Sequence, residues 1–214
     1  MDYTDLSVII KRNMETTVKT SAGTQSVSSA RERLLAAADQ LFYEEGIHTV
    51  GIDRIIEQAG VAKATLYSAF GNKDGLIRAY LQGRLADRQG RVNRALAGIE
   101  SPRERILAVF DVLGRFCQDP RFHGCAFVNA SAESSPGSAA VEVSDESRAW
   151  NHALFAGLAA EAGAEAPDQL ARRLMQLYDG AVVAARMDRD PAAAALARST
   201  AAVLVDAAVA AAST

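Results

Sequence analysis

The segment that decides the fold is Ile47–Leu81, IHTVGIDRIIEQAGVAKATLYSAFGNKDGLIRAYL. Its first part predicts a short helix, because four apolar residues recur at the period of one buried helical face. They are Ile52, Ile55, Ile56 and Ala59. Gly60 follows directly, and a glycine at this position can take the left-handed conformation that ends a helix. We therefore expect the chain to turn at Gly60, with Val61 filling the angle between two helices.

A second short helix is predicted over about Ala62–Phe70, where Leu66 and Phe70 share a face and point inward. Its outward face then carries cationic, hydroxyl-bearing and small side chains. These are Lys63, Ala64, Thr65, Tyr67 and Ser68. Such a face suits the major groove of DNA, since lysine reaches phosphate or guanine, threonine reaches phosphate or a thymine methyl, and a tyrosine hydroxyl binds phosphate. The two helices together are predicted to form a DNA-binding helix-turn-helix.

The residues that follow extend the predicted DNA-binding surface. Asn72 is placed to cap a third helix, whose first-turn amides together with Lys73 can hold another phosphate. The alternative is an ordinary helical hairpin in an all-α core, with Tyr67 half-buried and Lys73 merely solvated. An accidental hairpin has no reason to gather threonine, tyrosine and lysine on its exposed side, which favours the DNA-binding interpretation.

At Ala59–Leu76 the sequence AGVAKATLYSAFGNKDGL resembles the tetracycline-repressor family of bacterial transcription regulators. That family carries AGVS, a TLY triplet, an aromatic-phenylalanine pair and a lysine that opens the fourth helix. The resemblance spans about residues 31–85 at motif level, and beyond them it rests on GCAFVNASAE at Gly124–Glu133 and on the number of helices.

Two departures from the family pattern concern the reading surface. Ala62 stands where the family has a serine cap on the recognition helix, an interaction worth about 1 kcal/mol. Ser68 and Ala69 stand where the family often has a bulky histidine or tyrosine before the phenylalanine. The small residues remove contacts to phosphate or base from this face.

The resemblance implies an all-α fold of about nine helices, with an N-terminal three-helix DNA-binding module and a C-terminal helical domain for ligand binding and dimerisation. The expected domains are a flexible arm over 1–28, the helix-turn-helix domain over 29–73 and the ligand-binding and dimerisation domain over 74–214. The implied function is a repressor that binds a palindromic operator on double-stranded DNA as a homodimer. A small-molecule effector would release it by shifting the long helix that follows Asn72. The alternative is a helical small-molecule-binding or scaffold protein that dimerises without regulating DNA.

Composition fits a soluble cytoplasmic protein. The 214 residues, 49% of them apolar, suffice for one sizeable core or for a small domain fused to a larger one. The first residues are acidic where a signal peptide is basic, and their apolar run is short, so neither secretion nor membrane insertion is predicted. The net charge of −3 divides into 0 for residues 1–30, +2 for 31–94 and −5 for 95–214. Screening beyond about 10 Å allows the mildly positive module to bind phosphate beside an acidic body.

The chain before the module is predicted to be a mobile arm, because Thr20–Ser29 consists of small and polar residues without a helical period. Its basic residues, Lys11, Arg12 and Lys19, are more simply the charges of a disordered tail than contacts to DNA. Met14 is an alternative start of the protein.

Helical signals continue along the rest of the chain. Ser29 and Glu32 form a capping box that predicts the start of the first helix, which carries an apolar stripe. The stripe is Leu34, Leu35, Ala38, Leu41 and Phe42. A long helix is expected from Asn72 to about Leu96, and the next is capped at Ser101. Glycine and proline divide the remainder into further helical runs, with no alternating strand pattern.

The last two helical runs, Pro167–Met187 and Pro191–Ala212, are rich in alanine, leucine and valine. Paired with their symmetry mates they would form a four-helix dimer interface, and a two-fold dimer is what a palindromic operator requires. A single helix-turn-helix buries too little surface for specific affinity, which favours this dimer. The alternative is that the same faces pack within one chain.

The middle helices supply candidates for an effector cavity, most of them aromatic. They are Phe110, Leu113, Phe116, Phe127, Asn129, Trp150, Phe155 and Tyr178. The resemblance favours Phe127, Asn129 and Trp150 among them. Few charged residues stand nearby in the sequence, which predicts an apolar or aromatic ligand held by one or two hydrogen bonds. The simpler alternative is that these side chains fill the core.

No enzymatic activity or cofactor is predicted. The sequence has no phosphate-binding glycine loop, no GxSxG elbow and no HExxH helix, and its three histidines are scattered. Cys117, His123 and Cys125 lie close in sequence and could in principle bind a metal or sense oxidants. Their spacing matches no common zinc pattern, so no metal site is predicted, and two reduced thiols are the simpler interpretation.

Overall fold

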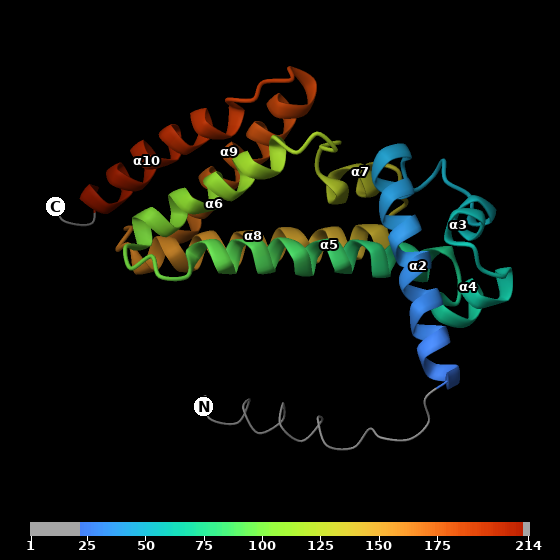
Figure 1. Ribbon diagram of the computed structural model, residues 1–214. Coiled ribbons are helices and arrows are strands. Elements are labelled where there is room, and N and C mark those ends of the chain that lie inside the picture. The colour runs from blue at the N-terminus through green and yellow to red at the C-terminus, as the bar shows by residue number, and fades with distance from the viewer. Residues whose placement is uncertain (1–21, 212–214) are drawn as a thin grey trace, which may run out of the picture.

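The computed structural model describes residues 22–211, and all the regular structure in this range is helical, as the sequence predicted (Figure 1). The helices are α2 (Ala22–Glu45), α3 (Ile52–Ala59), α4 (Lys63–Phe70), α5 (Lys73–Leu96), α6 (Pro102–Cys117), α7 (Ala126–Ala132), α8 (Ala139–Glu161), α9 (Pro167–Met187) and α10 (Ala193–Ala211). Helices α2 to α4 form a small head at one end of the molecule, and the longer helices form the body (Figure 1).

The head is held by an apolar core to which each of its helices contributes. Leu34 of α2, Ile55 of α3 and Leu66 of α4 are each 0% exposed, and they pack with Leu76 and Leu81 from the first half of α5. Of the inward positions predicted from the 3.6-residue period in α3 and α4, Ile55, Ala59 and Leu66 are buried. Ile52, Ile56 and Phe70 are half-buried against the same core. Burial of about 1.5 to 3 kcal/mol for each such side chain stabilises the three short helices, which would be marginal alone.

The first helix begins earlier than the capping box predicted. Helix α2 starts at Ala22 and passes through Ser29, so the expected start at Ser29 is wrong, and residues 22–28 are helical rather than part of an arm. The packed turns around Leu34 supply the nucleus, and each further residue then adds a backbone hydrogen bond without a new nucleation cost. The basic residues assigned to the arm lie outside the described residues.

The turn between α3 and α4 has the geometry that its sequence indicates. Gly60 has φ +62° and ψ +46°, the left-handed conformation, and its amide closes the last turn of α3. The guanidinium of Arg33 donates through Nε to the carbonyl of Ala59 at 3.1 Å and so satisfies one of the free carbonyls at this helix end. Val61 is half-buried against the head core, as expected for a residue in the interhelical angle.

The body is a stack of helices in which α5 and α8 lie side by side and α10 is outermost (Figure 1). Its core centres on Phe110 of α6 and Phe155 of α8, 1% and 0% exposed, whose ring centroids are 5.9 Å apart. Gly114 of α6 faces Ala194 of α10, and a Cβ added at Gly114 would lie in ordinary van der Waals contact with the alanine methyl, at 3.6 Å. Small residues thus let these two helices approach closely.

Helix α5 belongs to both head and body. Its first turns are capped by Asn72, whose Oδ1 accepts from the amide of Gly75 at 2.8 Å, as predicted. Leu76 and Leu85 of α5 lie in the head core, whereas Val92 and Leu96 lie in the body core. The expected boundary near residue 73 therefore marks the start of a shared helix and not a break in packing.

Helix α10 is long and apolar enough to cross a membrane by length and composition, with a mean hydropathy of 1.5 over its best window. Of that window, 28% is buried inside the protomer. Its buried face consists mainly of alanine and packs on α6 and α9. Larger apolar side chains, including Leu196 and Val203, point outward and are each 67% exposed.

We predict opposite effects on stability for alanine at Gly60 and at Gly83. The left-handed backbone at Gly60 makes Gly60→Ala destabilising by about 1 to 2 kcal/mol, although its Cβ would meet no atom within 4 Å. Gly83 lies in the middle of α5 with equally open space, so Gly83→Ala should stabilise by up to about 1 kcal/mol. Urea unfolding at one protomer concentration measures both; a Gly60→Ala protein as stable as the wild type would contradict the argument.

Candidate nucleic-acid interface and ligand cavity

The outward face of α4 presents the side chains that the sequence placed there. Lys63, Ala64 and Ser68 are exposed, and Tyr67 is 45% exposed, one of the largest apolar surfaces left open on the head. Thr65 is half-buried, and its amide bonds to the carbonyl of Ala62, which is the N-cap and makes no side-chain capping bond. Helix α4 thus lacks a side-chain cap, as the sequence predicted from Ala62.

Lys63 is held by an acidic neighbour. Its Nζ lies 2.9 Å from Oδ1 of Asp53 in the first turn of α3, and both side chains are exposed. The hydrogen bond from Lys63 to Asp53 raises the pKa of the lysine. An anion approaching α4 must therefore compete with the Asp53 carboxylate for this cation.

Lys73 offers a cation without such a competitor. It opens α5 directly after the Asn72 cap, is half-buried and has no hydrogen-bond or ion-pair partner within residues 22–211. Burial lowers the pKa of Lys73, and the charge of Glu133 opposes that shift. The Asn72 oxygen is occupied by the cap, so only its amide NH₂ remains to donate. The pair lies at a helix N-terminus beside α4, a position whose free amides and positive charge are suited to an anion.

Arg31 was missed by the sequence analysis. It lies in α2, and its guanidinium carbon sits 4.9 Å from the ring centroid of Phe70 at the end of α4. This contact holds an exposed cation at the edge of the reading helix. Only the fold brings Arg31 and Phe70 together, so no spacing rule could have found it.

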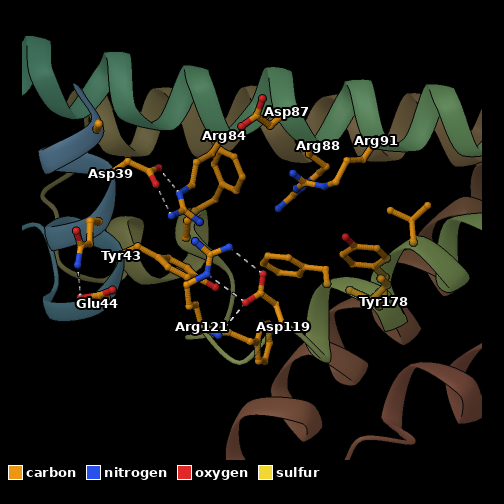
Figure 2. A pocket seen from close by; sticks show the side chains of 18 residues that line it. Asp39, Tyr43, Glu44, Arg84, Asp87, Arg88, Arg91, Asp119, Arg121 and Tyr178 are labelled. Atoms are coloured by element: carbon orange, nitrogen blue, oxygen red, sulfur yellow. Dashed lines mark hydrogen bonds and ion pairs between the residues drawn. The ribbon is translucent and has the colours of Figure 1, made fainter. Parts of the chain in front are cut away.

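A cavity of about 580 Å³ lies where the head meets the body (Figure 2). Its walls come from α2, α5, α6, the loop before α7, α7 itself and α9. The lining residues are Ala36, Asp39, Gln40, Tyr43, Glu44, Arg84, Asp87, Arg88, Arg91, Val112, Leu113, Phe116, Asp119, Arg121, Phe122, Ala126, Phe127 and Tyr178. The volume falls within the range of small-molecule sites, about 300 to 1,000 Å³.

The structure brings half of the predicted ligand residues to this cavity. Leu113, Phe116, Phe127 and Tyr178 line it. The other four do not line it. Phe110 and Phe155 are buried in the body core behind Tyr178, and Trp150 packs between the two cores. Asn129 is exposed, and its side-chain amide donates to the carbonyl of His123. For these four, the simpler alternative of core or surface structure fits better.

The sequence predicted few charged residues around the ligand, but four arginines and four carboxylates line the cavity. Arg84 donates to both carboxylate oxygens of Asp39, at 2.7 and 3.0 Å, and Arg121 pairs with Asp119 at 3.2 Å. These charges come from α2, α5 and a loop, whereas the residues predicted for the cavity lie mainly in the aromatic segments of the middle helices. A signal was present, since Arg84, Arg88 and Arg91 recur at the period of one helical face.

Tyr43 of α2 ties the head to the loop that borders the cavity. Its hydroxyl donates to the carbonyl of Gly124 at 3.0 Å and accepts from the amide of His123 at 2.9 Å. Burial raises the pKa of this hydroxyl, so it remains protonated and can serve as both donor and acceptor. Glu133, after α7, accepts from the amide of His48 at 2.7 Å and makes a second tie between body and head.

The cysteines and His123 do not form a cluster. Within residues 22–211 no group of three or more metal-ligating side chains is close enough to hold an ion. Burial raises the pKa of Cys117 to about 11, which leaves it a protonated and unreactive thiol. Cys125 accepts a hydrogen bond from Arg88 at 3.7 Å.

Comparison with known proteins assigns this architecture. Residues 34–80 match the family described as bacterial regulatory proteins, tetR family, and residues 102–201 match the tetracyclin repressor-like C-terminal domain. The solved structure of a TetR-family transcriptional regulator from Streptomyces coelicolor is 35% identical, with a TM-score of 0.77 over 87% of this chain and 97% of that one. The reduced form of NemR from Escherichia coli is 27% identical with a TM-score of 0.70, over 80% of this chain and 94% of that one. The chain belongs to the TetR family, and its resemblance to that family is confirmed.

Curated relatives carry the names of transcriptional regulators. The activator FasR from Mycolicibacterium smegmatis is 31% identical over 64% of this chain, and the repressor NemR from Escherichia coli is 34% identical over 48%. The matched regions span 62% of FasR and 53% of NemR. One relative is named an activator and the other a repressor, so the two names do not agree on the direction of regulation.

We predict that Asp53→Asn tightens non-specific DNA binding by about 3- to 10-fold at low salt, because it frees Lys63 and removes a negative charge from the α3–α4 face. Fluorescence anisotropy with a random-sequence duplex measures the effect. Asp168→Asn, which removes a carboxylate on α9 paired with Arg172, is the control and should leave the affinity unchanged. Equal affinities for wild type and Asp53→Asn would show that this face is not the one that meets DNA.

Proposed function

We propose that the protein is a ligand-responsive repressor in the cytoplasm that binds a palindromic operator as a homodimer. One observation carries the DNA-binding part: α4 offers Lys63, Tyr67 and Ser68 on one open face, directly beside the unpaired cation Lys73 at the capped start of α5. A helix with such a face fits the major groove, and a helix N-terminus with a lysine beside it fits the flanking phosphate. Repression is proposed by analogy with the relative NemR, which is named a repressor.

The dimer is proposed to form through α9 and α10. Six large apolar side chains are exposed in the described part of the chain, and four of them lie on these two helices. Val183 and Met187 of α9 are 58% and 73% exposed, and Leu196 and Val203 of α10 are spaced at seven residues and so share a face. The small residues of α10 meanwhile pack inside the protomer, so the apolar outer face is what remains for a symmetric partner.

The proposed response to an effector follows from the position of the cavity. Its walls include Asp39 and Tyr43 of α2 and Arg84 of α5, the residues that join the head to the body. A ligand that displaces or tightens these contacts changes the angle of the head on α5. Because two heads must match two half-sites at once, a small change in this angle lowers operator affinity through differential binding to two states.

The alternative function is a helical binding or scaffold protein that leaves DNA alone. It predicts an apolar dimer face and a cavity equally well, but it gives no reason for an exposed lysine, tyrosine and serine on α4. DNA binding is therefore the discriminating property.

For the regulator we expect a salt-sensitive gel-shift complex with the DNA upstream of its own gene. Lys73→Ala and Tyr67→Ala should each weaken it by about 1 to 3 kcal/mol, since each removes a contact to the duplex. Tyr67→Phe removes the hydroxyl and keeps the ring, and so distinguishes their contributions to binding. Arg172→Ala on α9, far from the head, should bind like the wild type. Retained binding in both alanine variants at the head would refute the assignment of these contacts.

For the dimer we predict that Val203→Glu weakens self-association by about 100-fold or more, because two-fold symmetry places two buried charges in the interface. Light scattering after size-exclusion chromatography should show a dimer for the wild type and a monomer for the variant. Val128→Glu is the matched control, since Val128 is 55% exposed on α7, away from α9 and α10. A dimeric Val203→Glu protein would place the interface elsewhere.

A further inference from the structure

Helix α5 carries a row of arginines along the cavity. Arg84, Arg88 and Arg91 are spaced by four and three residues, so they project from one face, and Figure 2 shows them on the α5 side of the cavity. Arg84 is neutralised by Asp39. The other two have no ion-pair partner among the residues that the structure describes, which leaves two uncompensated cations in one wall.

Arg88 is the more constrained of the two. Its Nη1 donates to the hydroxyl of Ser147 at 3.0 Å, its Nη2 donates to the sulfur of Cys125 at 3.7 Å, and its guanidinium carbon lies 4.6 Å from the ring centroid of Phe127. These contacts fix the plane of the guanidinium. A guanidinium has five N–H donors, so three remain without a partner in the described chain.

The surrounding carboxylates do not neutralise Arg88. Asp179, whose charge acts on it, is paired with Arg148 at 2.9 Å. Within the cavity wall, Asp39 is paired with Arg84, and Asp119 is paired with Arg121. Glu44 lies at the α2 end of the cavity and accepts a hydrogen bond from Gln40, and Asp87 is exposed. A partly buried arginine that has only neutral partners is costly unless an anion comes to it.

The positive character continues beside the cavity. A second hollow of about 490 Å³ shares four lining residues with the first: Arg91, Val112, Phe116 and Asp119, whose carboxylate pairs with Arg121. It is also lined by Arg94 and Arg115. Neither Arg94 nor Arg115 has an ion-pair partner in the described part of the chain. The field along this side of α5 therefore favours a negative ligand over a neutral one, although the body as a whole is acidic.

Apolar side chains and a further hydroxyl also line the cavity. Leu113, Phe116, Phe122 and Phe127 offer aliphatic and aromatic surface. The hydroxyl of Tyr178 has no hydrogen-bond partner in the described chain and faces the same space from α9 (Figure 2). Burial raises the pKa of Tyr178, with Arg88 opposing that shift, so the hydroxyl remains a donor at neutral pH.

We propose that the cavity binds an organic monocarboxylate, with its carboxylate on Arg88 and the hydroxyl of Tyr178, and its apolar or aromatic body against Phe116, Phe122 and Phe127. A fixed guanidinium matches the planar, two-oxygen geometry of a carboxylate, and the aromatic wall requires a carbon skeleton behind it. The sequence predicted an apolar or aromatic ligand held by one or two hydrogen bonds. The proposed ligand keeps such a body and adds a charged anchor, which the arginine row of α5 would bind.

Binding of the carboxylate does not depend on the proposed function. Its effect on DNA binding rests on that function. A carboxylate on Arg88 and Tyr178 lies between α5 and α9, one turn along α5 from Arg84, and alters the charge balance around the Arg84–Asp39 pair. Binding is therefore coupled to the contact that sets the head on the body.

Isothermal titration calorimetry on the full chain tests the proposal with benzoate, phenylacetate and octanoate, each against its primary amide. At least one acid should bind, and its amide should bind at least 10-fold more weakly because it has no charge to offer Arg88. Arg88→Gln should lower the affinity for the acid by about 10- to 100-fold, because charged hydrogen bonds to the carboxylate are lost. Arg88→Lys, which retains the charge without the fork, should fall between, and Arg172→Gln on the surface of α9 should bind like the wild type.

The proposal is overturned if none of the three acids binds, or if the amides bind as well as the acids. It is also overturned if a folded Arg88→Gln protein binds the acid like the wild type or more tightly. Arg88→Lys serves for this comparison if the glutamine variant unfolds. Gel shifts without any acid separate this outcome from a failure of the regulator proposal. Normal DNA binding with no acid binding would remove only the ligand class. Acid binding by a chain that ignores DNA would retain the site and remove the regulator.

Discussion

The position of the head on α5 depends on the contacts of the Arg84 guanidinium. It forms a two-pronged ion pair with Asp39 of α2 and lies 3.8 Å from the ring centroid of Tyr43 and 5.3 Å from that of Tyr80. The pair is only partly exposed, so water and salt screen it less than a surface ion pair. Because α2 carries the packing surface for α3 and α4, this contact, together with the apolar packing of Leu66 on Leu76, fixes where α4 lies relative to α5.

Helix α5 turns that local contact into a long-range one. It starts at the capped position beside α4, passes Arg84 and the cavity arginines, and ends in the body core at Leu96. A helix of this length moves as a nearly rigid rod, so a shift at its middle is carried to both ends. Tyr43 and Glu133 add hydrogen bonds from the head to the loop before α7 and to its end. The cavity thus lies at the joint between head and body, where a bound molecule has the greatest mechanical effect.

The local features of the fold could be predicted from the sequence, because they depend on local chemistry. The Gly60 turn, the Asn72 cap and the buried face of Leu66 follow from backbone sterics and helical period. The cavity could not, because Asp39 and Arg88 lie 49 positions apart and meet only through packing. The residues predicted for the ligand cavity were divided by the fold between cavity, core and surface, as Phe116, Phe155 and Asn129 show.

The central claim is that two copies of α4 meet DNA together, held at a fixed separation by a symmetric dimer. Selection of bound fragments by the full chain from sheared genomic DNA, followed by sequencing, tests this claim most directly. The account predicts an enriched inverted repeat whose half-sites are centred a whole number of helical turns apart, about 10 base pairs or a multiple of it. Enrichment of a single asymmetric site, or of no sequence at all, would contradict it.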